Sequence, residues 1–486
     1  MILLAIDDYS LQFRRNLCYY MSKPTVRKEP VLQPSKDSPK APDRQVANFY
    51  GTVLYDEGKY RMWYYGMNEV LPIAYQTSMI CYAESDDGIN WTKPNLGQIE
   101  CKGSSNNNAI YFPGIQSPGA CVIKDEDDPD PQRRYKLVYD PLQEKGPIRD
   151  SFGVPVSTLA TATSPDGINW KLGSGWPIDV FSELSSFYKH EGMYYVHGQG
   201  IFSGGGEGGS EVGRQGYLWV SPDFENWVQG WAEAFTLPEP SDPNKRGYEH
   251  SYDQVHLGIG AANFGNVQVG LFGRWRPGKG EPPIHTLKGI EGDLGLVVSS
   301  DGMHFREPVK SHIYISAADS LVTPREGKDY PTILCQYNGI LNVGDETRIY
   351  HGRWRNAGLT EDYHTEIALA TLPRDRWGAL GLFPKQSEGW VWSAPITLPE
   401  KGLEISINAD NEDLFELELS DSEFRLIPEF SGENAGVVNS EGGIESRVSW
   451  SGDISRIAGS EVRIKINMAA RDNLQPKLYA AYVNGQ

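Results

Sequence analysis

The sequence has few cysteines and no cysteine motif. Its 5 cysteines are spread over 486 residues, and no two of them form a C-x-x-C pair. This spacing predicts neither a disulfide framework nor a zinc site. The chain also lacks an apolar run long enough to cross a membrane. We therefore expect no metal, no other cofactor and no membrane partner.

Basic residues are outnumbered as well. The chain has 45 Lys and Arg against 64 Asp and Glu, which gives a formal net charge of −19. Phosphate-rich partners would be repelled by this charge, so nucleic acid is not an expected partner. The acidity is typical of a surface that keeps a protein soluble.

The start of the chain does not have the pattern of a signal peptide. The apolar residues 2–6 are followed at once by Asp7 and Asp8, so the apolar stretch is too short for a secretory signal. We expect a short β-strand here. Together with the cysteine usage, this favours a cytoplasmic location.

A repeated turn is the strongest feature that the sequence does contain. Each copy runs from Ser through Asp to an aromatic residue and follows a short apolar run. The copies occupy residues 85–91, 164–170, 221–227 and 300–305. An Asp-Gly pair suits a tight turn, because Gly tolerates positive φ. Repeats at this wide spacing are typical of a β-propeller, in which each blade is one antiparallel sheet.

The wider pattern predicts two domains. With 52 Gly, 32 Pro and 11% aromatic residues the composition suits an all-β protein, and 486 residues exceed one ordinary domain. Successive short strands, from residues 51–65 to residues 366–370, predict five blades. After about residue 385, strict alternation predicts two packed sheets. We predict a five-bladed β-propeller over 1–385 and a β-sandwich over 386–486.

Several segments resemble a family of glycosidases. They include residues 7–9, 50–56, 60–64, 106–108, 134–138, 370–376 and 448–450. On these segments the chain resembles the five-bladed propeller plus β-sandwich proteins related to glycoside hydrolase families 32, 43 and 68. It is most similar to an environmental bacterial glycosidase group. The resemblance covers nearly the whole chain and implies cleavage of glycosides. The Arg-Asp-Pro and Glu-Cys motifs of the better-known families are absent, so catalytic residues must be sought by position.

Acidic residues before innermost strands are the catalytic candidates. Glycoside hydrolysis needs two carboxyl groups on opposite sides of the bond, and the innermost strands of a propeller converge on one mouth. Asp43 precedes the first strand of blade one, Glu183 that of blade three, and Glu249 and Asp253 that of blade four. We predict Asp43 as base or nucleophile and Glu249 as general acid. Glu183 or Asp253 would tune the pKa or the orientation of these groups. As structural alternatives, Asp43 could pair with Arg44, and Glu183 could be a hydrogen-bonded structural acid.

Sugar binding requires aromatic faces and planar hydrogen-bond donors. Side chains of these types lie near the same strand ends, and the candidates are His250, Tyr252, Arg274, Trp275, His197, Gln199, His351 and Arg353. The similar segments 274–276 and 353–355 can also be structural repeats, and a single His is often a packing residue.

We predict a glycoside hydrolase that removes a terminal sugar, with a furanose as one option, from an oligosaccharide or glycoside. Two alternatives remain. A glycoside phosphorylase would need a cationic phosphate pocket, which Arg274, Arg276, Arg353 and Arg355 could form. A non-catalytic propeller would only bind carbohydrate. All three have a carbohydrate partner, and the sequence does not fix the oligomeric state.

Overall fold

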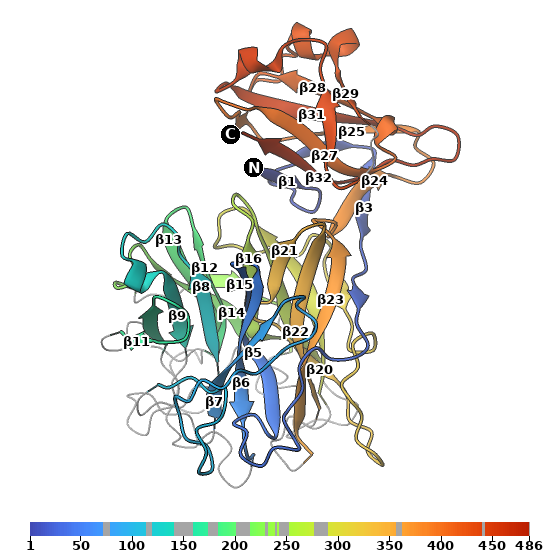
Figure 1. Cartoon of the computed structure of the whole chain (residues 1–486). Coiled ribbons are helices and arrows are strands. Elements are labelled where there is room, and N and C mark those ends of the chain that lie inside the picture. Colours follow the sequence, from blue (N-terminus) through green and yellow to red (C-terminus); the bar gives the residue numbers. More distant parts are fainter. Residues whose placement is uncertain are drawn as a thin grey trace.

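The computed structural model describes residues 1–70, 78–112, 119–139, 159–173, 183–200, 214–228, 232–238, 241–242, 252–276, 290–355, 362–439 and 443–485. Within these residues the regular structure consists of β-strands and short 3-10 turns (Figure 1). The predicted all-β class is therefore confirmed. No helix of the described part is long and apolar enough to cross a membrane.

In the described part of the chain, the strands between residues 25 and 373 form sheets of three, four, four and nine strands, and one parallel pairing divides the nine-stranded sheet into two antiparallel units. Each unit begins with an innermost strand, namely β5 (Val46–Asp56), β8 (Ala120–Lys124), β12 (Glu183–His190), β16 (Gln254–Asn263) or the pair β20 (Ile333–Cys335) and β21 (Ile340–Val343). Successive innermost strands contact each other, and β21 contacts β5. This closed ring is the arrangement that a five-bladed propeller requires.

The outer strands follow each innermost strand in chain order. They are β6 (Lys59–Met67) and β7 (Ser78–Ser85); β9 (Tyr135–Tyr139), β10 (Ala160–Ser164) and β11 (Lys171–Leu172); β13 (Met193–Gly200), β14 (Gln215–Ser221) and β15 (Ala232–Phe235); β17 (Gln268–Arg276), β18 (Glu291–Ser299) and β19 (Ile313–Ile315); and β22 (Glu346–Arg355), β23 (His364–Pro373) and β4 (Thr25–Val26). β4 comes from the start of the chain and pairs with β23, so the last blade is completed by an early segment.

The repeated turns join neighbouring blades. In the first copy, the Asp87 carboxylate accepts hydrogen bonds from the backbone N–H groups of Ile89 and Asn90, at 2.8 and 2.7 Å. Its Gly88 carbonyl accepts a 2.8 Å hydrogen bond from the Tyr350 hydroxyl of the last blade. In the second copy, the Gly167 carbonyl accepts one of 2.8 Å from Trp63 of the first blade. The repeats thus fix both the turn and the contact between blades.

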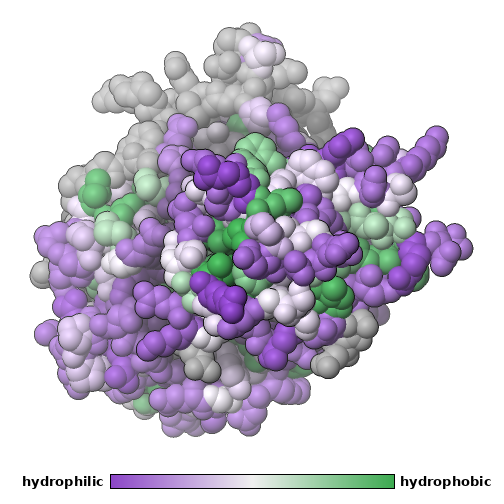
Figure 2. All heavy atoms as spheres, turned by 90° about the horizontal axis from the view of Figure 1, so that it is seen from above, coloured by the Kyte–Doolittle hydropathy of each residue, from purple (hydrophilic) through white to green (hydrophobic). Residues whose placement is uncertain are grey.

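The C-terminal strands form two linked sheets over one apolar core. They are β24 (Gly378–Leu382), β25 (Glu388–Trp392), β26 (Ile396–Thr397), β27 (Glu404–Asp410), β28 (Phe415–Ser420), β29 (Gly436–Val438), β30 (Ser446–Ser449), β31 (Glu461–Ala469) and β32 (Lys477–Asn484). They lie above one end of the propeller in Figure 1. Figure 2, seen from that end, shows a mainly hydrophilic surface with smaller hydrophobic areas.

The first strands of the chain join these C-terminal sheets. β1 (Ile2–Leu4) pairs with β32, β2 (Phe13–Arg15) with β25, and β3 (Leu17–Met21) with β24. The expected strand at the N-terminus is present. The division of the chain at residue 385 stays a prediction, but the pairing groups residues 1–21 with the C-terminal sheets, because the side chains of this segment share their core.

The propeller face opposite the C-terminal sheets is called here the mouth face. β23 ends next to β24 at the C-terminal sheets, so its first residue, His364, lies at the far end (Figure 1). β5, β12, β16 and β20 begin at this same end, and β13, β17 and β22 end there, because neighbouring strands of a blade are antiparallel. Side chains at these strand ends can therefore meet at one site.

Candidate active site

Two of the predicted acids lie at the mouth face. Glu183 is the first residue of β12, and Asp253 directly precedes β16. β12 and β16 contact each other along the ring, so both acids lie on adjacent blades. Glu249 and His250 lie outside the described residues, and their predicted roles stay predictions.

Glu183 is an accessible carboxylate held by two polar side chains. Its Oε2 accepts a 2.5 Å hydrogen bond from Gln199 Nε2, and the Arg214 guanidinium lies 3.6 Å from the same oxygen. The Glu183 side chain is 39% exposed. A nearby cation stabilises the ionised form of a carboxyl group, so this acid suits the role of a base or nucleophile.

Aromatic rings form a wall beside this carboxylate. The Arg214 guanidinium lies 4.6 Å from the ring centre of Trp275. Trp275 stacks on His256 at 4.0 Å, and His256 makes an edge contact with Trp354 at 5.2 Å. Trp354 in turn contacts Tyr50 at 5.5 Å. Trp275, His256 and Trp354 are each at most 6% exposed, so these rings support the site from behind.

Tyr50 marks the inner end of this wall. Its ring is stacked on Tyr337 at 5.0 Å and on Tyr65 at 5.9 Å. Burial raises the pKa of Tyr50 well above its usual range, with smaller effects from nearby groups that include Glu183. The phenol therefore stays neutral and can act as a hydrogen-bond donor beside Glu183.

Asp253 is paired with Arg274 rather than free. The two Arg274 nitrogens lie 2.8 and 2.7 Å from its Oδ2. Arg274 and Trp275 lie inside β17, and Arg276 ends this strand in ion pairs with Asp293 and Glu291. Tyr252, next to Asp253, is half-buried at the same blade entry. Blade four thus contributes the ion pairs of Arg274 and Arg276 and the half-buried ring of Tyr252.

Five predicted substrate contacts lie in the protein interior instead, each at most 4% exposed: His197, Gln199, Trp275, His351 and Arg353. His197 has no exposed surface and its Nε2 lies 2.9 Å from the Tyr188 hydroxyl. His351 Nε2 lies 2.7 Å from the Ser320 hydroxyl. Burial lowers the pKa of each histidine to about 3, so both rings are neutral. Arg353 is 1% exposed and donates to the carbonyls of Arg27 and Lys28. His197, His351 and Arg353 thus make their contacts inside the protein.

Asp43 is also buried. Its side chain has no exposed surface, and its Oδ2 accepts hydrogen bonds from the Tyr64 hydroxyl at 2.7 Å and from Lys93 Nζ at 2.5 Å. The predicted pairing with Arg44 is replaced by one with Lys93, because the Asp43 carboxylate points back into blade one. In this arrangement Asp43 does not reach a sugar at the mouth face.

The sequence did not single out Arg214, His256 or Tyr50 as site residues, and Trp354 entered only as part of the segment 353–355. Arg214 lies directly before β14, the third strand of its blade. The antiparallel pairing of β13 with β14 brings the start of this third strand, and with it Arg214, to the mouth face.

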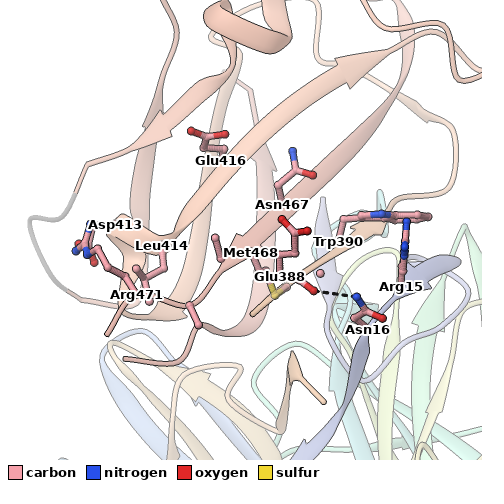
Figure 3. A pocket seen from close by; sticks show the side chains of 13 residues that line it. Arg15, Asn16, Glu388, Trp390, Asp413, Leu414, Glu416, Asn467, Met468 and Arg471 are labelled. Carbon is pink, nitrogen blue, oxygen red and sulfur yellow. Dashed lines mark hydrogen bonds and ion pairs between the residues drawn. The ribbon is translucent and has the colours of Figure 1, made fainter. Parts of the chain in front are cut away.

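A cavity lies on the C-terminal sheets, away from the mouth face (Figure 3). It has a volume of about 570 Å³, and Arg15, Glu388, Trp390, Glu416, Asn467 and Arg471 are among the residues that line it. Figure 3 shows the Arg15 side chain close to the Trp390 ring. Among the residues that the structure describes, no group of three His, Cys, Asp or Glu is placed to hold a metal ion.

Comparisons with known proteins give only distant similarities. No protein-family model matches the chain. It is 27% identical over 180 residues to the uncharacterized protein MT1551 of Mycobacterium tuberculosis (strain CDC 1551 / Oshkosh), over 34% of this chain and 48% of that protein. The chain thus spans about half the length of this relative.

Among solved structures, a glycosyl hydrolase from Bacteroides ovatus is 14% identical and has a TM-score of 0.44, over 72% of this chain and 94% of that one. An N-acetylgalactosamine deacetylase from F. plautii, in complex with blood group B trisaccharide, is 13% identical with a TM-score of 0.44, over 73% and 96% of the two chains. TM-scores below 0.5 establish neither the fold nor the activity of this chain.

Proposed function

We propose that this chain cleaves glycosidic bonds, with Glu183 as the base or nucleophile at the mouth face. The observation that carries the proposal is the partly exposed Glu183 carboxylate, held by Gln199 and Arg214 at the mouth face. A glycosidase needs a carboxylate that can reach the bond to be cleaved. The sequence resemblance to propeller glycosidases points to the same chemistry.

The second carboxyl group is assigned to the entry of blade four. Glu249, the predicted general acid, lies in this segment, and Asp253 is the described acid there. Because Asp253 is paired with Arg274, its role in this proposal is to orient the groups of the site. Glu249 donates the proton to the leaving oxygen. The substrate would be an oligosaccharide or glycoside that presents a terminal sugar, furanose included, to the Glu183 carboxylate.

The test is product release by Glu183→Gln. Oligosaccharides and aryl glycosides are screened with and without phosphate, and the product is identified as free sugar or sugar phosphate. The amide removes the ionised oxygen at nearly constant shape, so turnover should fall by roughly 10²–10⁴-fold. Glu191→Gln is the matched control, because Glu191 is exposed in the turn at the other end of the same hairpin.

The outcomes separate the three functions. Free sugar as product supports a hydrolase, and sugar phosphate formed only with phosphate supports a phosphorylase. Carbohydrate binding without any product would support a non-catalytic module and contradict the proposal. Full activity in Glu183→Gln would remove Glu183 from the mechanism.

A further inference from the structure

The mouth face has a cavity of its own, which is lined mainly by cations. It has a volume of about 340 Å³, within the range of about 300–1,000 Å³ found for small-ligand pockets. It is called here the cationic pocket, and its charged lining consists of Lys36, Arg44, Arg325, Arg355, Asp362 and His364. These residues come from the loop before β5, the segment before β20, the end of β22 and the start of β23.

Three of the four cations have no carboxylate partner in the described chain. Arg325 is paired with Asp362 at 3.0 Å. Among the described residues, no ion pair involves Lys36, Arg44 or Arg355. The buried Glu366 lies behind the pocket and pairs with Arg353 at 3.5 Å. The pocket therefore has an excess of positive charge, which is unusual in a chain of net charge −19.

Two side chains present unused polar atoms to the pocket although they are almost fully buried. Arg355 is 5% exposed and His364 is 3% exposed. Arg355 donates to the Thr323 carbonyl, but its Nε has no partner, and neither has Nε of Arg44. Buried donors without partners are costly unless a ligand or water accepts from them.

The protonation state of His364 adds a further requirement for a ligand of this pocket. Its Nε2 lies 3.1 Å from the ionised Glu366, so Nε2 carries the proton. Burial, and smaller effects of Lys36 and Arg355, lower the pKa of His364. The neutral ring then offers Nδ1, which has no partner, as an acceptor. A ligand that fills the pocket should combine an oxyanion for the arginines with a hydroxyl for His364.

We propose that the cationic pocket binds an oxyanion that also carries a hydroxyl group, either a hydrogen phosphate or the carboxylate of an acidic sugar. Guanidinium groups pair with both through bidentate hydrogen bonds. The pocket adjoins the candidate active site, because Tyr363 lines the pocket and makes an edge contact with Trp354 at 6.4 Å. Under the proposed function, this pocket would hold the anionic part of the substrate or the phosphate of a phosphorolytic reaction.

Mutual repulsion among these cations agrees with this. Burial and, next, the charge of Arg355 lower the pKa of Lys36. Burial also lowers the pKa of Arg355. The charge of Arg325 lowers this pKa further, whereas Glu366 raises it. An oxyanion would relieve this repulsion, whereas a neutral sugar would not.

The test is titration calorimetry of the full chain with inorganic phosphate, glucuronate and glucose at constant ionic strength. Phosphate or glucuronate should bind, and the variant Lys36→Gln plus Arg44→Gln should weaken that binding by roughly tenfold or more. The control variant Lys40→Gln removes an exposed charge from the same loop. It should bind these anions as the wild type does. Arg44→Lys should keep part of the affinity. Binding of phosphate alone, or of glucuronate alone, would identify the source of the oxyanion.

A measurement on the wild type avoids any folding defect of the variants. Phosphate or glucuronate should slow the modification of Arg44 by phenylglyoxal, and glucose should not. The proposal is overturned if neither anion binds, or if the double variant binds as tightly as the wild type. Binding is measured without turnover, so a chain that binds an anion and cleaves no glycoside would refute only the proposed function.

Discussion

Gln199 holds Glu183 and the backbone of the next blade at the same time. Its Nε2 donates a 2.5 Å hydrogen bond to Glu183, and its Oε1 accepts one of 2.7 Å from the Leu257 N–H. Gln199 has no exposed surface, so this geometry is fixed by packing. The carboxylate is thus oriented by blade three and blade four together, which makes its position depend on the closure of the ring.

This contact predicts the effect of Gln199→Met. Met fills a similar volume but removes both hydrogen bonds, which leaves the Leu257 N–H unsatisfied at a cost of about 1–3 kcal/mol in stability. We expect kcat to fall about tenfold or more while KM changes little, because Gln199 positions Glu183 and does not touch the substrate. Steady-state kinetics and urea unfolding measure the two effects. Gln132→Met, on the surface, is the control, and an unchanged kcat in Gln199→Met would contradict the positioning role.

The third repeated turn departs from the pattern, and the departure is itself testable. Phe224 stands where the other copies have Gly and has a φ of 68°. Its ring is 2% exposed and packs against Phe187 at 5.6 Å and Tyr194 at 5.5 Å. The backbone strain of about 1–2 kcal/mol is offset by this burial.

Phe224→Gly should therefore destabilise the protein, although it relieves the strained φ. Loss of a buried Phe side chain costs about 3–5 kcal/mol, which exceeds the gain from the backbone. We expect a net loss of about 2 kcal/mol or more, measured as the free energy of unfolding in urea. An increase in stability would show that the turn geometry, not the ring, dominates at this position.

The strands of the propeller could be predicted because their pattern is local. Alternation and the Ser-Asp turns located β6, β7, β17 and β22, and they also placed Glu183 and Asp253 at strand starts. The partners of these groups depend on distant segments, and no spacing in the sequence indicates them. Lys93 is 50 positions from Asp43 and pairs with its buried carboxylate at 2.5 Å. The cationic pocket joins Lys36 to Arg355, so its charge excess becomes visible only in the folded chain.

The pairing of β1, β2 and β3 with the C-terminal sheets escaped prediction for the same reason. The alternation in residues 461–466 showed that a sheet forms there, but strand pairing across nearly the whole chain leaves no local signal. A short apolar stretch at the start of the chain could form the edge strand of any sheet, so its composition does not indicate its partner.

Buried histidines give the protein a defined pH dependence. Burial lowers the pKa of His351 to about 3 from an ordinary value of 6.5, so the folded state favours the neutral ring. This contribution is fully present above pH 6.5 and is lost as the pH falls from there toward the folded-state pKa. The urea midpoint should decrease between about pH 7 and pH 5.

His351→Gln should reduce this pH dependence, because the amide can keep the contact with Ser320 and does not titrate. His304→Gln serves as the control, since that ring is 71% exposed. An equal slope of stability against pH in the wild type and in His351→Gln would show that other groups cause the acid sensitivity.

Deletion of residues 1–21 tests whether the N-terminal strands belong to the C-terminal sheets. Leu3, Leu11 and Leu17 are each at most 3% exposed and lie in the core of these sheets, and each buried side chain of this kind contributes about 1.5–3 kcal/mol. The deletion also leaves the paired edges of β24, β25 and β32 open. We expect the C-terminal region to become sensitive to limited proteolysis while fragments of the propeller persist, with Tyr9→Ser, an exposed change in the same segment, as the control. If the truncated chain resisted proteolysis as the full chain does, the first 21 residues would be dispensable and the boundary near residue 385 would describe the folding units better.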